Sequence, residues 1–114
     1  MNFNRVILGG RLTRDVDLRK TGSGTSVANI GFACNRKVKR GEEWIDEPVF
    51  VDVTMFGRRA EVLAERFKKG SPVLFEGELC LDQWEDKETG EKRQKLKVIA
   101  DSFEFVGGKS DLPF

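Results

Sequence analysis

Two large rings share one side of a short segment with polar residues. In residues 49–56, Phe50 and Phe56 alternate in step with Asp52 and Thr54. The other side of the same repeat is aliphatic and consists of Val49, Val51, Val53 and Met55. In a strand these two sets form opposite faces. A core needs the aliphatic face and has little use for rings among polar groups, so the aromatic face is the first candidate for a binding surface.

Two tryptophans extend this aromatic set. Trp84 ends a predicted strand at the base of a long hairpin, and Trp44 lies among Lys, Arg and Glu. Exposed rings beside cations suit single-stranded nucleic acid, because bases stack on the rings at roughly 1–3 kcal/mol each while the cations follow the phosphates. We therefore interpret Phe50, Phe56 and Trp84 as a stacking surface. The alternative is that they pack under a loop or in a subunit interface, and for Trp44 both interpretations stay open.

Residues that would support catalysis or metal binding are scarce. The chain has no histidine, which removes the commonest general base and metal ligand. Cys34 and Cys80 are expected to be small buried side chains rather than a disulfide or a metal pair. The sequence has no G-x-x-x-x-G-K-[ST] or G-x-S-x-G motif, and Asp52 alone is too little for a metal-dependent nuclease. We predict a non-enzymatic protein without metal or cofactor.

The length and composition predict one domain. The chain has 114 residues, of which 39% are hydrophobic and 34% charged, and a chain of this size can bury a core without disulfides. No apolar run approaches the roughly 18 residues that a membrane helix needs. The N-terminus lacks the pattern of a secretory signal. We therefore expect a cytoplasmic protein that does not bind membranes.

The net charge of +1 conceals strong local clusters. Residues 36–40 carry four positive charges and residues 42–47 carry four negative ones. Residues 76–91 carry seven acids and one lysine, whereas residues 92–97 carry four cations. The basic clusters could line a groove for nucleic acid, or the charges could alternate on solvated hairpins.

The periodicity predicts an all-β chain with one helix. A helical stripe spans residues 57–68 and consists of Ala60, Leu63, Ala64 and Phe67. We expect strands over 3–12, 25–36, 47–56, 71–83 and 93–106, with loops at 13–24, 37–46 and 84–93 and a short extended piece at 17–20. Five strands with a helix between the third and fourth is the element order of an OB-fold, a five-stranded Greek-key barrel. Residues 1–106 would form this domain, and 107–114 a short flexible tail.

Several segments resemble the bacterial single-stranded DNA-binding proteins. They are N-R-V-I-L (4–8), G-R-L-T-R-D (10–15), S-G-T-S-V-A-N (23–29), F-G (56–57), A-E (60–61), K-K-G-S (68–71), E-G (76–77), W-E-D (84–86), T-G (89–90) and the final D-L-P-F (111–114). The resemblance covers residues 4–106 and the last four residues. It implies an OB-fold that assembles as a homotetramer and coats single-stranded DNA without sequence preference in replication, recombination and repair, at the nucleoid.

The resemblance also implies which residues bind. The stacking aromatics of the family fall on Phe50, Phe56 and Trp84, and its basic contacts on Arg5 and Arg58. Further candidate contacts are Lys69, Arg11, Arg19, Lys95 and Lys97. In the family, the tip formed here by Asp111, Leu112, Pro113 and Phe114 binds replication and repair proteins.

The chain departs from the family pattern at four places. A further family aromatic falls near Val38 and is missing, although Trp44 lies nearby and could substitute. Residues 81–83 read Leu-Asp-Gln where the family often has cations, and Asp52 places a negative charge between two rings. The linker before the tip is also short. The first three departures predict weaker DNA binding. The alternative function is a primosome-type OB-fold protein-interaction module with secondary nucleic-acid binding.

Overall fold

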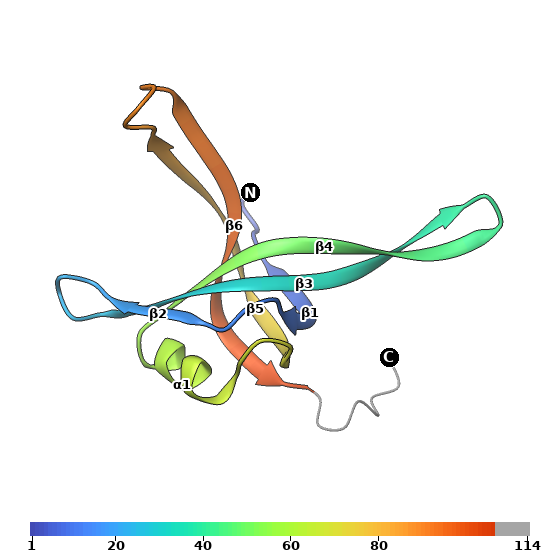
Figure 1. Ribbon diagram of the computed structural model, residues 1–114, viewed down its shortest axis with the longest axis horizontal. Helices are drawn as coiled ribbons and strands as arrows, with labels where there is room; N and C mark the ends of the chain where they lie inside the picture. Colours follow the sequence, from blue (N-terminus) through green and yellow to red (C-terminus); the bar gives the residue numbers. More distant parts are fainter. Residues whose placement is uncertain (107–114) are drawn as a thin grey trace.

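The computed structural model describes residues 1–106, which form six strands and one helix (Figure 1). In chain order the elements are β1 (Val6–Leu12), β2 (Asp17–Lys20), β3 (Ser26–Arg40), β4 (Glu43–Phe56), α1 (Arg58–Arg66), β5 (Pro72–Glu85) and β6 (Lys92–Phe105). The tail at 107–114 and the predicted partner-binding tip lie outside the described residues.

Five of the strands close into a barrel. They pair in the order β1-β5-β6-β4-β3, and the end of β1 returns to pair with β3. Gly10 allows this closure, because a Cβ at this position would overlap the backbone carbonyl oxygen of Ala33 on β3. The short β2 pairs with β3 outside the barrel. The prediction of a five-stranded OB-fold barrel with its helix between the third and fourth barrel strands is confirmed.

Two long hairpins project from the barrel in different directions (Figure 1). The pairing of β3 with β4 continues to Arg40 opposite Glu43, and that of β5 with β6 to Glu85 opposite Lys92. The prediction of a loop at 37–46 is therefore wrong, since only the turn at Gly41 and Glu42 interrupts the two strands. We call the pair of strands at 36–47 the β3–β4 arm.

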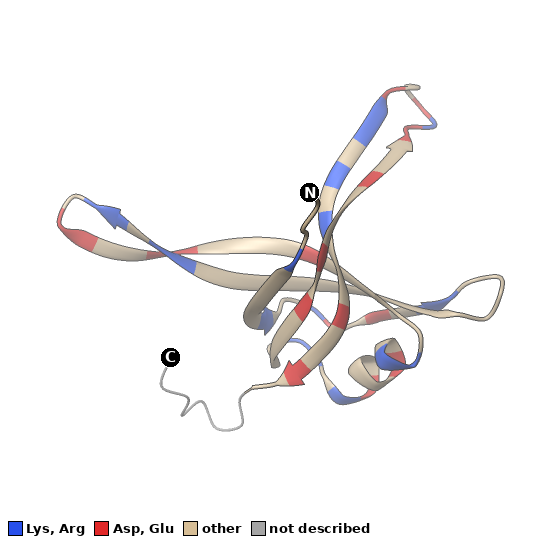
Figure 2. Ribbon diagram, turned by 180° about the vertical axis from the view of Figure 1, so that it is seen from behind, with Lys and Arg blue, Asp and Glu red and all other residues tan. Residues whose placement is uncertain are grey.

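The physical reason for the error lies in the charges of the β3–β4 arm. The basic cluster on β3 faces the acidic cluster on β4, with ion pairs from Lys37 to Asp46 (3.7 Å), Arg36 to Glu47 (3.7 Å) and Arg40 to Glu47 (3.4 Å). Figure 2 shows this separation of the two signs between the strands. Opposite charges across a pair of strands favour pairing, whereas each cluster viewed alone suggests a solvated loop.

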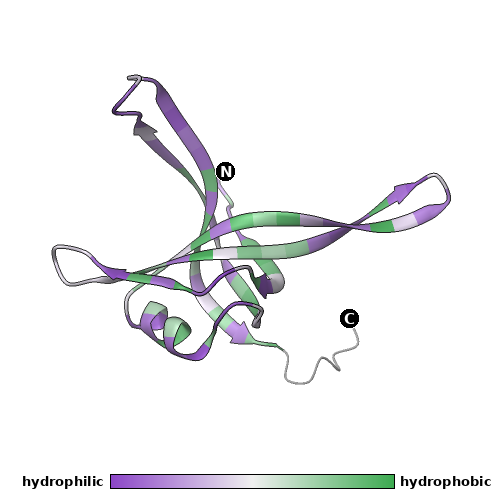
Figure 3. Cartoon of the chain, in the orientation of Figure 1, coloured by the Kyte–Doolittle hydropathy of each residue, from purple (hydrophilic) through white to green (hydrophobic). Residues whose placement is uncertain are grey.

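The core lies where the strands cross, and the projecting hairpins are hydrophilic (Figure 3). Phe32 of β3 and Phe75 of β5 meet edge to face, with ring centroids 5.2 Å apart, and both are fully buried. The helix α1 covers one end of the barrel with Ala60 and Leu63, and Phe67 follows directly after it. None of the buried hydrophobic residues lies in the β3–β4 arm, so the barrel and not the arm holds the fold together.

Candidate nucleic-acid interface

The two rings of β4 point away from the core, as their alternation predicts. Phe50 is 72% exposed and Phe56 is 49% exposed, whereas Val53 and Met55 between them are buried. Thr54 shares the parity of the rings but is only 4% exposed. At this position β4 is paired with both β3 and β6. The exposed aromatic face is therefore interrupted at its middle.

A groove opens beside Phe50 and collects residues from distant parts of the chain. Its volume is about 610 Å³, and its lining includes Phe50, Asp52, Lys95 and Lys97. Lys95 and Lys97 line this groove because β6 runs parallel to β4, with Val53 opposite Val98. Their positions on β6 therefore bring them next to Asp52 on the outside of the barrel. The structure thus places one predicted ring and two predicted cations around a single groove.

The carboxylates of the groove are paired with cations. Asp52 forms ion pairs with Lys95 and with Arg14, whose Nη2 lies 4.0 Å from Oδ1. Lys97 pairs with Asp82 across the β5–β6 hairpin at 3.5 Å. The two acids that depart from the family pattern are therefore compensated by cations that the neighbouring elements supply. Electrostatic repulsion of DNA by these acids is correspondingly reduced.

Arg14 is a residue of this groove that sequence reasoning did not select. It follows β1 and lies in the G-R-L-T-R-D segment, which was noted only for its resemblance. No local signal could have placed it beside Asp52, because its position depends on how the chain after β1 crosses β3. A backbone hydrogen bond from the N–H of Thr13 to the carbonyl of Gly31 (2.9 Å) fixes that crossing.

Trp84 lies farther out on the same side of the β5–β6 hairpin. It is 46% exposed and stands opposite Arg93, just as Asp82 stands opposite Lys95. Directly opposed residues of an antiparallel pair share a face, and every second pair lies on the same side. Trp84 and Lys95 therefore belong to one surface, which continues from the groove along the hairpin.

The end of this hairpin is fixed by Asp86. Its Oδ1 accepts a hydrogen bond from the backbone N–H of Glu88 (2.9 Å), and Arg93 donates to its Oδ2 (3.0 Å). These hydrogen bonds, the backbone one first, lower the pKa of the Asp86 carboxyl. Arg93 is thereby held beside the turn.

Trp44 stands on the β3–β4 arm and is 66% exposed. It lies opposite Lys39 and six residues before Phe50, which is an even spacing on the same strand. In an untwisted strand, Trp44 would lie on the side of β4 that carries Phe50, about 20 Å farther along the strand. The twist of the two-stranded ribbon rotates it relative to Phe50. Its exposure argues against the interpretation that it folds back onto a neighbouring segment.

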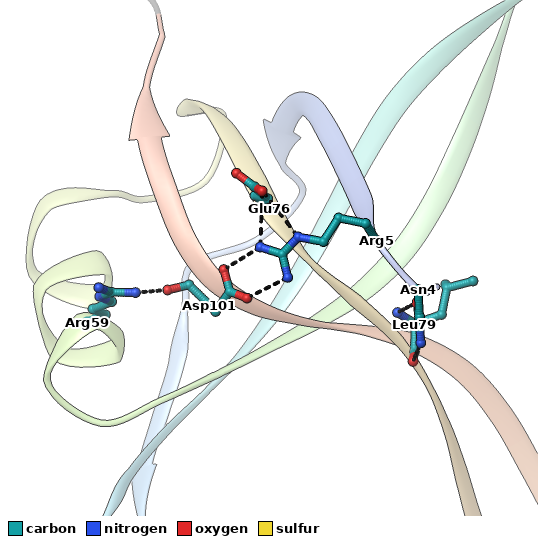
Figure 4. Close-up of polar contacts among 6 residues, drawn as sticks. All are labelled: Asn4, Arg5, Arg59, Glu76, Leu79 and Asp101. Atoms are coloured by element: carbon teal, nitrogen blue, oxygen red, sulfur yellow. Dashed lines mark hydrogen bonds and ion pairs between the residues drawn. The ribbon is translucent and has the colours of Figure 1, made fainter. Parts of the chain in front are cut away.

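Arg5, a predicted DNA contact, is instead held by two acids outside the groove (Figure 4). Its guanidinium makes paired hydrogen bonds to Asp101 (2.9 and 3.1 Å) and two to Glu76 (3.0 and 3.2 Å). These bonds raise the pKa of Arg5 and, led by the bonds from Arg5, lower the pKa of Asp101. Arg59 of α1 donates to the backbone carbonyl of Asp101, so the cluster joins three elements to the segment before β1.

The other predicted cations also lie away from the groove. Arg58 lines a separate hollow between α1 and β6, and Arg11 donates from Nη1 to the carbonyl oxygen of Gly70 (2.9 Å). Arg19 is on β2 and pairs with an aspartate of the same strand, whereas Lys69 lies in the turn before β5. None of these four residues lines the groove beside Phe50. Arg19 shares a face with Phe56, because Arg19 stands opposite Val27 and Val27 stands opposite Phe56. The contact of all four with DNA stays a prediction.

Within residues 1–106, no cluster of three or more His, Cys, Asp or Glu side chains is arranged to hold a metal ion. Over the same residues, no helix has the length and apolar character needed to cross a membrane.

The chain is similar to known proteins over most of its length. The model of the single-strand binding protein family matches residues 3–106. The chain is 47% identical to the single-stranded DNA-binding protein of Wolinella succinogenes over 94% of this chain and 66% of that protein. It is 39% identical to that of Borreliella burgdorferi over 96% of this chain and 74% of the relative.

A solved structure is also similar. It is the crystal structure of a deletion mutant of the single-stranded DNA binding protein from Thermus aquaticus, with a TM-score of 0.83 and 29% identity. The match covers 94% of this chain and 52% of that one. The present chain thus spans between about half and three quarters of the length of these proteins.

Proposed function

Since the chain belongs to the single-strand binding protein family, we propose that it binds single-stranded DNA without sequence preference. The observation that carries this proposal is the groove beside Phe50, in which an exposed ring adjoins Lys95 and Lys97. Bases stack on Phe50, Phe56 and Trp84, and phosphates contact the cations between them. None of these groups reads a base edge, so every base is accepted.

A fluorescence titration tests the proposal. Poly-dT is added to the protein while tryptophan emission is followed, first at low salt and then at increasing NaCl concentrations. We expect quenching, with an affinity that falls as salt rises, by about 0.7 in log–log slope per phosphate neutralised. Poly-dA should also quench, and a duplex competitor should not displace the single strand. No quenching at low salt would contradict the proposal.

The biological setting is proposed on the same basis. Coating of single strands would protect them during DNA replication, recombination and repair, at the nucleoid in the cytoplasm, without catalysis and without a metal or cofactor. The resemblance further supports a homotetramer as the binding unit.

We propose that the residues Asp111, Leu112, Pro113 and Phe114 bind replication and repair proteins. The ring of Phe114 can enter an apolar pocket, and the carboxylate of Asp111 can meet a basic rim of that pocket. Removal of residues 111–114 should leave poly-dT affinity unchanged and abolish capture of such partner proteins by the immobilised chain. Equal capture by the full and the shortened chain would contradict this role.

A further inference from the structure

The guanidinium of Arg14 lies in the space that a side chain at position 31 would fill, because residue 31 is a glycine. Gly31 of β3 stands opposite Asp52 of β4, and a Cβ on Gly31 would overlap the guanidinium of Arg14 and the hydroxyl of Thr13. The absence of a side chain therefore lets Arg14 lie flat across β3 and reach the carboxylate of Asp52 on the next strand.

Asp52 holds two cations from opposite sides of the groove. Arg14 comes from the segment after β1, and Lys95 comes from β6. Both cations are more than half exposed, whereas the Asp52 side chain is 36% exposed. The guanidinium lies 4.0 Å from Asp52, which is beyond hydrogen-bonding distance. Its donors are therefore available to another anion that enters the groove beside Phe50.

We infer that Asp52 is an internal counterion that competes with DNA phosphate for Arg14 and Lys95, and that Arg14 is a further phosphate ligand of the groove. The inference rests on the proposed function. A phosphate offers these cations the same charge and the same paired oxygens as a carboxylate. On binding, the phosphate takes the place of Asp52, and the uncovered carboxylate takes up a cation from solution.

This exchange has a thermodynamic signature. Binding of a strand to free lysines and arginines releases the counterions of the phosphates, which produces the salt dependence. Uptake of a cation by Asp52 cancels part of that release. Asp52 should therefore both weaken DNA binding and flatten its dependence on salt.

The substitution Asp52→Asn tests the inference in the full chain, with poly-dT as the probe. We expect the affinity at low salt to rise roughly three- to tenfold, since two exposed ion pairs no longer have to be broken, and the salt slope to become steeper. Glu65→Gln is the matched control, because it makes the same change in net charge on α1, outside the groove. A gain no larger than that of Glu65→Gln would overturn the inference.

Arg14 is tested by removing and by moving its charge. Arg14→Gln should weaken binding several-fold more than Arg66→Gln, a control of equal charge on α1. Gly31→Ala keeps the charge but displaces the guanidinium. It is made in a Thr13→Ala background, because its Cβ would also meet the Thr13 hydroxyl. There it should weaken binding when Arg14 is present and have little effect together with Arg14→Gln. Additive effects of the two substitutions would contradict a shared site.

Failure of the inference and failure of the proposed function are distinguishable. If the unaltered protein does not quench with poly-dT, the proposed function fails. If it binds but Asp52→Asn changes neither affinity nor salt slope, the proposed function stands and the role of Asp52 is overturned. Thermal unfolding of each variant separates a loss of binding from a loss of folded protein.

Discussion

The hydrogen bonds around Arg5 give this residue a structural role on the side of the barrel. Four of its hydrogen bonds run to Glu76 and Asp101, on two different strands. These bonds use four of the five N–H donors of the guanidinium, so a phosphate would compete with both carboxylates for Arg5. In this respect Arg5 differs from Arg14, whose one ion pair is longer than a hydrogen bond.

The acid dependence of stability should report this role. Arg5 lowers the pKa of Asp101 in the folded state, so the pair stabilises the fold above the unfolded carboxyl pKa of about 3.9 and loses that effect as the pH falls through the lowered folded pKa. Arg5→Gln should therefore reduce the free energy of unfolding at pH 7, with the difference shrinking toward pH 2. Urea titrations at both pH values measure this, and an equal difference at both would contradict it.

The exposed rings should contribute independently to DNA affinity. Phe50→Ala and Trp84→Ala should each cost about 1–3 kcal/mol of poly-dT binding, because each removes one stacking platform. Filter binding or anisotropy of labelled DNA measures this, since Trp84→Ala also removes a fluorophore. Phe105→Ala is the control, as this ring of β6 is 63% exposed and lies outside the groove. An unchanged affinity of Phe50→Ala and Trp84→Ala for poly-dT would mean that these rings do not stack on bases.

At the scale of elements, the β3–β4 arm combines a neutral charge balance with one exposed ring. Residues 38–45 contain two cations and two acids besides Trp44. The arm contributes nothing to the buried core. Any contribution of the arm to DNA binding should therefore come mainly from Trp44 and not from net charge.

Excision of the arm tests this. Residues 38–45 are replaced by Asn-Gly, which joins the paired residues Lys37 and Asp46 through a tight two-residue turn. The stability of the barrel should be unchanged, and the poly-dT affinity should fall by the same factor as in Trp44→Ala, about 1–3 kcal/mol. A much larger loss after excision than after Trp44→Ala would mean that the charged residues of the arm also bind DNA.

At the scale of the whole molecule, the exposed apolar residues suggest an assembly larger than one chain. Several large side chains stand on the barrel surface away from Phe50, among them Phe3 and Ile7 near β1. Large exposed apolar side chains are candidates for contacts between subunits. This supports the proposed homotetramer.

Light scattering after gel filtration tests the assembly. We expect a mass of about four times the 12.9 kDa chain, independent of protein concentration over the micromolar range. Ile7→Glu should lower that mass if the surface beside β1 is an interface, because a charge would be buried there. A single-chain mass for the unaltered protein would contradict the tetramer.

Sequence patterns alone determined the local features of this protein. Apart from Thr54, the two-residue repeat of residues 49–56 identified which side chains face the core and which rings are exposed. The stripe of Ala60, Leu63 and Phe67 located the helix. These patterns suffice because alternation and helical period arise from the backbone geometry of neighbouring residues. The element order, together with the resemblance, then favoured the barrel.

Only the tertiary structure decided which charges face one another. Arg5 meets Asp101 across 96 residues of chain, and Asp52 meets Lys95 because β4 and β6 run side by side in parallel. Local patterns contain no information on such long-range pairings. The sequence therefore shows how many cations the chain has, but not which of them line the groove and which are paired with carboxylates outside it. For the same reason the separate charge clusters predict a loop where the structure has the β3–β4 arm, since each strand of the arm is stabilised by the opposite charges of the other.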